Sequence, residues 1–299
     1  MKKKIFIILL NLVFIFIIVE GTCYLSYCKK YDYRPFHSPY CVKRLPFDSF
    51  FSFVKKDGFR PPVGLEYKKR PIVLFGCSFA WGWGLEEEQR FQYKLSQAMK
   101  RPVYNRAYKE WFGLAQLLYQ SRTKDLYEEI KSPEYVIYVF FDDHIRRMLS
   151  CIMFPFQEYP HLRYRIYNGT LEKDKLDFLC NNLYSYQKIS QLKLDYDMGH
   201  NHKKVFNLMR EHFIEAKQEM DKHWKDYKFI IYIYNDDYQF SEEDINRLKN
   251  DGFIVVTTEE LIGEPLDQPQ YQISKTDLHP NEKAWDKLAP AFVEFLNKL

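Results

Sequence analysis

Short apolar runs alternate along the chain with segments whose apolar residues recur at helical spacing. The runs are Ile72–Phe75, Val103–Ala107, Tyr135–Phe141, Phe229–Tyr234 and Phe253–Thr257. Continuous runs of this length predict strands buried on both faces, as in a parallel sheet. Helices are expected over Glu87–Lys100, Phe112–Ile130, Val205–Tyr227, Glu242–Asn250 and Glu282–Lys298. The alternation predicts a three-layer α/β/α fold around a mainly parallel, five-stranded sheet.

The N-terminal residues 1–28 carry a different pattern. Lys2–Lys4 precede an apolar run over Ile5–Val19, which only Asn11 interrupts. A basic segment followed by an apolar one is typical of chains that enter a membrane. Extended to Leu25, the run reaches the roughly 20 residues of a span, and no Ala-x-Ala-like site follows. We expect a transmembrane anchor with an exported body on the periplasmic or extracytoplasmic side, a cleaved signal peptide being the alternative.

Two further segments fall outside the alternation. Residues 29–69 are rich in Tyr, Phe, Pro and Lys without clear periodicity, which indicates a stalk that then wraps the core. Residues from about 148 to 202 lack a strand–helix rhythm and are interpreted as an insertion, a lid or specificity element, within an α/β domain over 70–299. Cys151 and Cys180 flank part of this insertion and could be joined if the body is exported.

A serine stands where the first predicted strand ends. Ser78 lies in the glycine-containing stretch Gly76–Gly84, between the apolar run and a charged segment that favours helix. A turn between a parallel strand and a helix presents a side chain at the carboxyl edge of the sheet. Ser78 is therefore a candidate nucleophile, and its own N–H is a candidate oxyanion donor.

A histidine near the C-terminus supplies the second half of this chemistry. The stretch Asp277–Asn281 precedes the last predicted helix and contains an Asp-x-His pair. A serine nucleophile needs a base, and the base needs a third group that holds its tautomer. We predict that His279 is the base and that Asp277 orients it.

These two stretches resemble the first and last sequence blocks of SGNH/GDSL-type hydrolases. Gly-Cys-Ser-Phe-x-x-Gly-x-Gly matches the first block, with Cys77 where many members carry Asp. Asp-x-His-Pro-Asn resembles the last, although many members carry the acid three residues before the histidine, where this chain has Thr276. The spacing of two is also similar to exported alginate-type O-acetyltransferases. The resemblance covers roughly 70–299 without the insertion and implies the fold and an ester chemistry.

The family's two oxyanion blocks are altered in this chain. The second block resembles Asn105–Gly113, in which Gly113 is the preferred N–H donor. The third block normally ends its strand in Asn, and alignment places Asp143 there. A carboxyl group donates only when protonated, so Arg146 or His144 are alternative donors. The Asp-Asp pair at this strand end could instead bind a cation or cap the next helix.

The composition makes some classes of function less expected but does not identify the function. With 44 basic and 40 acidic residues the net charge is +4, which gives no indication of nucleic-acid binding. We expect no metal and no cofactor. The expected function is a membrane-tethered serine esterase acting on acyl esters of a glycan, with acetyl as the favoured acyl group. O-acetyl transfer to a polysaccharide, or glycan binding without catalysis, are the alternatives.

Overall fold

The computed structural model describes residues 11–22, 59–108, 113–149, 164–167, 170–173, 196–197, 200–235, 238–275 and 277–299. Its chain divides into two compact units, of which the first comprises Met1–Pro46 with Leu149–Val205 and the second Phe47–Met148 with Phe206–Leu299. The second unit contains the sheet and every candidate site residue predicted from the sequence.

The predicted parallel sheet is confirmed. Its strands are β1 (Ile72–Gly76), β2 (Val103–Asn105), β3 (Tyr135–Phe140), β6 (Lys228–Ile233) and β7 (Ile254–Thr257). They are all parallel and lie in the order β2-β1-β3-β6-β7. Every residue of the central strand β3 and of its neighbour β1 is buried, as the uninterrupted apolar runs predict.

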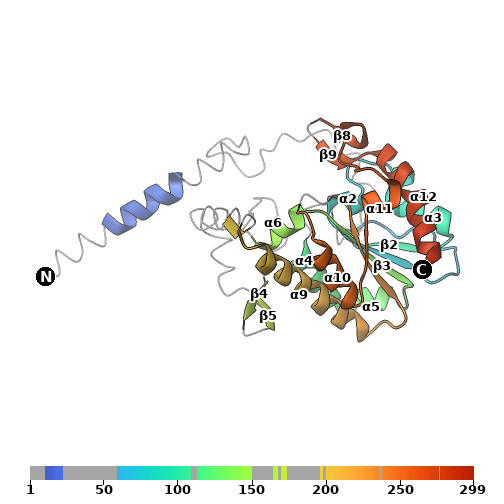
Figure 1. Cartoon of the computed structure of the whole chain (residues 1–299), viewed down its shortest axis with the longest axis horizontal. Helices are drawn as coiled ribbons and strands as arrows, with labels where there is room; N and C mark the ends of the chain where they lie inside the picture. The colour runs from blue at the N-terminus through green and yellow to red at the C-terminus, as the bar shows by residue number, and fades with distance from the viewer. Residues whose placement is uncertain are drawn as a thin grey trace. The chain divides into compact units, whose positions relative to one another are not determined.

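Helices cover both faces of this sheet, which gives the three layers (Figure 1). On one face α3 (Phe91–Met99), α11 (Thr258–Ile262) and α12 (Glu282–Lys298) pack together. On the other face lie α4 (Leu114–Ser121), α9 (His202–Asp221) and α10 (Glu242–Asn250). Polar pairs tie this second group, with Arg210 of α9 contacting Asp251 at 2.6 Å and Arg122 contacting Glu215 of α9 at 3.3 Å.

Two helices that the apolar pattern predicts as continuous are divided in the structure. The segment predicted over Glu87–Lys100 is a 3-10 turn, η2 (Glu87–Gln89), followed by α3. The segment predicted over Phe112–Ile130 is α4 followed by α5 (Lys124–Glu129), for which Thr123 is the N-cap residue. The apolar residues at helical spacing show which face of a helix is buried. The same spacing continues across a break in the helix when the two shorter helices pack on the same sheet.

Short elements at the ends of strands were not predicted. They are α2 (Ser78–Trp81), α6 (Asp143–Leu149), α11, η3 (Pro269–Tyr271) and the antiparallel hairpin of β8 (Gln272–Ser274) and β9 (Asp277–Pro280). Each spans seven residues or fewer. That is too short for hydrophobic periodicity to show.

In the first unit, residues 11–22 form a helix whose apolar side chains from Leu12 to Val19 are all exposed. In the part of the chain that the structure describes, no helix is long and apolar enough to cross a membrane. The anchor over 1–28 therefore stays a prediction. The predicted insertion contains a two-stranded hairpin, β4 (Tyr164–Tyr167) and β5 (Thr170–Lys173). Most of the predicted stalk, and Cys151 and Cys180, lie outside the described residues.

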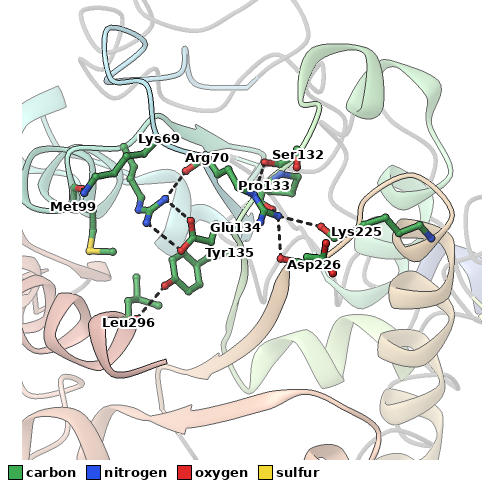
Figure 2. Close-up of polar contacts among 11 residues, drawn as sticks. Lys69, Arg70, Met99, Ser132, Pro133, Glu134, Tyr135, Lys225, Asp226 and Leu296 are labelled. Carbon is green, nitrogen blue, oxygen red and sulfur yellow. Dashed lines mark hydrogen bonds and ion pairs between the residues drawn. The ribbon is translucent and has the colours of Figure 1, made fainter.

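The amino-terminal edge of the sheet is tied by arginines (Figure 2). Arg70, just before β1, donates to four backbone carbonyls: those of Ser132, Pro133, Lys225 and Asp226. Arg101, just before β2, forms two hydrogen bonds with the Glu134 carboxylate, at 2.6 and 3.1 Å. Such paired, bidentate contacts fix the strands at the edge opposite the candidate site.

Candidate active site

The backbone turn at the end of β1 determines where Ser78 lies. Gly76 has φ +146°, and a Cβ atom there would lie 3.0 Å from the carbonyl oxygen of Val139 on β3. Only glycine tolerates both conditions, so the chain turns sharply where an L side chain would clash. Helix α2 then begins at Ser78, whose side chain is largely buried. The hydroxyl is thereby placed at the carboxyl edge of the sheet.

The structure brings Ser78, His279 and Asp277 into one hydrogen-bonded chain. Ser78 Oγ lies 2.7 Å from His279 Nε2, and His279 Nδ1 lies 2.5 Å from Asp277 Oδ1. The backbone N–H of His279 also donates to Asp277 Oδ1, at 3.1 Å. The side chains of Asp277 and His279 meet because both lie on β9 two residues apart, and alternate residues of a strand share a face. The two-residue spacing thus suits a strand.

The environment of His279 favours the neutral imidazole. Burial is the main cause that lowers its pKa below 6.5; the hydrogen bond and charge of Asp277 act in the opposite direction, and the positive charge of Arg147 lowers it further. The rings of Phe79 and Trp83 lie 5.1 and 5.8 Å from the imidazole, centroid to centroid. With Nδ1–H donating to Asp277, Nε2 is left to accept the proton of the Ser78 hydroxyl.

Asn281, which the sequence places at the start of the last helix, fixes the hairpin that carries His279. Asn281 is the N-cap of α12, where its Oδ1 accepts the N–H of Ala284 at 3.2 Å. Its Nδ2 donates to the carbonyls of Gln270 and Gln272, at 2.9 and 2.8 Å. The Asn281 side chain therefore connects the start of α12 to β8 and to the 3-10 turn η3 that precedes it. An Asn before a helical pattern is a recognised cap signal, so the sequence carried this information.

The backbone N–H of Gly113 has a hydrogen-bond partner in this structure. It donates to Gln116 Oε1 at 2.9 Å, as part of the cap at the start of α4. The role of Gly113 as an oxyanion donor stays a prediction, and in this structure its N–H is occupied by Gln116. The preceding residues of the second block, 109–112, lie outside the described residues. Of the predicted oxyanion donors, Ser78 is the one whose position adjoins the histidine.

Asp143 is an ion-pair partner. Its Oδ2 accepts a hydrogen bond from Nε of Arg147 and forms an ion pair with Nη2 of the same side chain, each at 2.8 Å. Of the two alternative donors predicted from the sequence, Arg146 is exposed and His144 is fully buried, 2.9 Å from the Tyr138 hydroxyl. In this structure Asp143 therefore accepts from Arg147, and its role as an oxyanion donor stays a prediction.

The described residues contain no group of three or more His, Cys, Asp or Glu side chains that could hold a metal ion. Cys77, beside the serine, is buried and not in a disulfide. The contacts among Ser78, His279 and Asp277 suit nucleophilic attack by an activated serine, with an imidazole base and a carboxylate that orients it.

No family model matches the chain, and no curated protein matches it significantly. Solved structures do resemble it. One is an acetyl xylan esterase from the rumen bacterium Butyrivibrio proteoclasticus, at 11% identity and a TM-score of 0.45, covering 78% of this chain and 64% of that one. Lipolytic G-D-S-L family proteins from Desulfitobacterium hafniense (13% identity, TM-score 0.44, 76% and 99% covered) and Veillonella parvula (11%, 0.45, 77% and 100%) are also similar.

These similar structures are an acetyl xylan esterase and two lipolytic proteins of the G-D-S-L family. This chain spans about two thirds of the length of the acetyl xylan esterase. The similarity is one of fold at low identity. What this chain does is inferred from the residues of its own site.

Proposed function

We propose that the chain is a serine esterase that cleaves acyl esters through Ser78, His279 and Asp277. The observation that carries the proposal is the continuous chain of contacts, 2.7 Å from serine to histidine and 2.5 Å from histidine to aspartate. Ser78 is 201 positions from His279 in the sequence, and the fold brings the two together at the carboxyl edge of the sheet. A non-catalytic role would not require this alignment.

The geometry supports a two-step reaction. As Ser78 Oγ attacks the ester carbonyl, His279 Nε2 takes the hydroxyl proton. The tetrahedral intermediate collapses when the imidazolium returns this proton to the leaving alcohol, which leaves an acyl group on Ser78. Water then attacks the acyl-serine with His279 again as base, releasing the acid and restoring the serine. Asp277 stabilises the imidazolium in both steps and stays ionised.

Charge develops on the carbonyl oxygen in both steps and must be stabilised. The backbone N–H of Ser78, at the start of α2, is one proposed donor. Arg147 adds a positive charge at this edge of the sheet, close enough to lower the pKa of His279. We assign Asp143 the role of holding that arginine through its ion pair.

For the substrate we propose an acetyl or other short acyl ester of a glycan. The half-buried indole of Trp83 lies beside His279, where a sugar ring attached to the ester oxygen could stack. Transfer of the acyl group to a sugar hydroxyl is the second candidate, favoured by the Asp-x-His spacing that resembles exported O-acetyltransferases. The two differ only in whether water or an alcohol attacks the acyl-serine.

We further propose that the chain is tethered to a membrane with its body exported. The support is the apolar run over Ile5–Val19 and the exposure of the apolar side chains on the helix of residues 11–22. A helix that is apolar all round needs an apolar environment. Fractionation of cells should place the full chain with membranes, and protease added outside should digest the body. A soluble body with a shortened N-terminus would point to a signal peptide instead.

The esterase proposal is tested with a fluorophosphonate probe and a series of p-nitrophenyl esters of increasing chain length. The wild type should be labelled and should hydrolyse the acetyl ester fastest. Ser78→Ala should do neither. Ser121→Ala is the matched control, because Ser121 is a buried serine whose hydroxyl donates to the Leu118 carbonyl. Absence of both labelling and hydrolysis in the folded wild type would overturn the proposal.

A further inference from the structure

Two buried arginines, Arg60 and Arg90, contact the segment that follows Ser78, and they have no role in the proposed reaction. Arg60 is 2% exposed, yet neither of its Nη atoms has a hydrogen-bond partner in the part of the chain that the structure describes. Its Nε makes one long contact, 3.4 Å, to the carbonyl oxygen of Trp81. Four strong N–H donors of one guanidinium are therefore buried without an acceptor in the described structure.

Part of the environment of Arg60 is understandable without a ligand. Its guanidinium carbon lies 3.2 Å from the ring centroid of Trp81, the last residue of α2. Arginine stacks readily on an indole, and this contact stabilises a cation through the ring face. Stacking occupies the flat face of the guanidinium but supplies no acceptor for the N–H groups, which lie in its plane.

Arg90 brings a second buried cation to the same place. It is 4% exposed, and its Nε and Nη2 donate to the Leu85 carbonyl at 3.0 and 2.7 Å. Its side chain packs so closely on Gly82 that a Cβ there would lie 2.6 Å from Arg90 Cγ. The turn from Gly82 to Leu85, which carries Trp83, thus lies against Arg90.

The two charges act on each other. Burial, and next the charge of Arg90, lower the pKa of Arg60 to about 9, so Arg60 remains protonated at neutral pH. Glu87 and Glu86 oppose this shift from a distance, and no ion pair joins either of them to Arg60 in the described structure. Uncompensated buried charge is strongly unfavourable, so a counterion is required that the described side chains do not supply.

We propose that Arg60 and Arg90 form a buried binding site for a small anion, of the carboxylate or phosphate type. The planar fork of a guanidinium matches the paired oxygens of such groups, and the burial restricts the occupant to a few atoms. The occupant accepts from the Nη groups of Arg60 and neutralises the pair. It thereby stabilises the turn from Gly82 to Leu85 and the end of α2. This inference is independent of the esterase proposal.

Thermal unfolding of the full chain at pH 7 tests the site, with sodium phosphate, acetate or chloride titrated at constant ionic strength. In the wild type the melting temperature should rise and saturate, by about 5–10 °C at a hundredfold excess over Kd, because ligand bound only to the native state stabilises it. The salt that saturates at the lowest concentration identifies the class of anion. General salt effects on protein surfaces rise without saturation and are thus distinguishable.

Arg60→Met should abolish the saturating rise, since a thioether side chain of similar length binds no anion. Arg122→Met is the matched control, because Arg122 is a surface arginine whose guanidinium contacts Glu215, and it should keep the wild-type titration. Equal titration curves for wild type and Arg60→Met would overturn the proposal. Should Arg60→Met not fold, a wild-type curve that never saturates with any of the three salts would overturn it as well.

Discussion

The two edges of the parallel sheet use arginine and glycine in opposite ways. At the amino edge, Arg70 donates to backbone carbonyls and both Nη atoms of Arg101 bind the Glu134 carboxylate, although Arg101 Nε has no hydrogen-bond partner in the described structure. At the carboxyl edge, β1 ends on Gly76 in a conformation that other residues avoid, and the Nη atoms of the buried Arg60 have no hydrogen-bond partner among the described residues. The first edge is organised for stability, and the second retains the strain and unsatisfied groups that are typical of functional sites.

The largest difference in activity between variants at the two edges should appear when Ser78 or His279 is replaced. Ser78→Ala or His279→Ala should lower kcat by about a thousandfold or more, because the residues act as a unit. Both variants should unfold within about 1 kcal/mol of the wild type, since the catalytic contacts are few. Steady-state kinetics and urea unfolding on the same preparations check this. A His279→Ala variant that keeps most of its turnover would contradict the assignment.

The strained end of β1 should show the largest stability effect. Gly76→Ala should cost roughly 2–4 kcal/mol, from the unfavourable φ and the contact with the Val139 carbonyl at 3.0 Å. Gly263→Ala is the control for φ alone: Gly263 has φ +74°, but a Cβ atom there would meet no other atom within 4 Å. It should cost about 1 kcal/mol. Equal losses measured by urea unfolding would show that the close approach of β3 does not matter.

The amino edge should lose stability without losing activity. Arg101→Met leaves the partly buried Glu134 carboxylate without its two hydrogen bonds, which should cost about 1–3 kcal/mol. Lys124→Met removes an exposed pair with Glu128 and should cost less than about 0.5 kcal/mol. The activity of each folded variant should equal that of the wild type. A fall in kcat for Arg101→Met would mean that the edges are coupled through the strands.

The central fold could be predicted because its strands are buried on both faces. Runs such as Tyr135–Phe141 have no alternation to misread, and β3 ends one residue earlier than the apolar pattern suggests. The positions at which helices break were harder to predict. The buried apolar residues of α4 and α5 recur at helical spacing on both sides of the break at Thr123, so the pattern does not show it. The hairpin of β8 and β9 is short and largely polar, so no hydrophobic period distinguishes it from a loop.

Some residues of the site could be predicted from the sequence and others could not. Ser78 and the Asp-x-His pair stand in recognisable local contexts, and the structure brings their side chains together. The oxyanion donors depended on backbone and side-chain partners that an aligned position does not reveal. Asp143 and Arg147 are four residues apart, which is pairing distance on a helix, but α6 has to be recognised before the spacing is informative. Gln116, three residues after Gly113, was likewise an available cap signal.

The smallest predicted effect concerns the charge that Arg147 contributes to the site. Ester hydrolysis should rise with pH as His279 loses its proton, with a midpoint below pH 6.5 because burial and Arg147 both lower its pKa. Arg147→Met removes one of these causes, so the midpoint should move to higher pH by a fraction of a unit. Asp143→Asn removes the carboxylate that offsets Arg147, so its shift should have the opposite sign. Arg146→Met, on the exposed side of the same helix, should leave the profile within error. Opposite shifts for the two partners of one ion pair would distinguish an electrostatic role for Arg147 from loss of packing, which would lower the rate at every pH without moving the midpoint. A shift to lower pH in Arg147→Met would exclude that role.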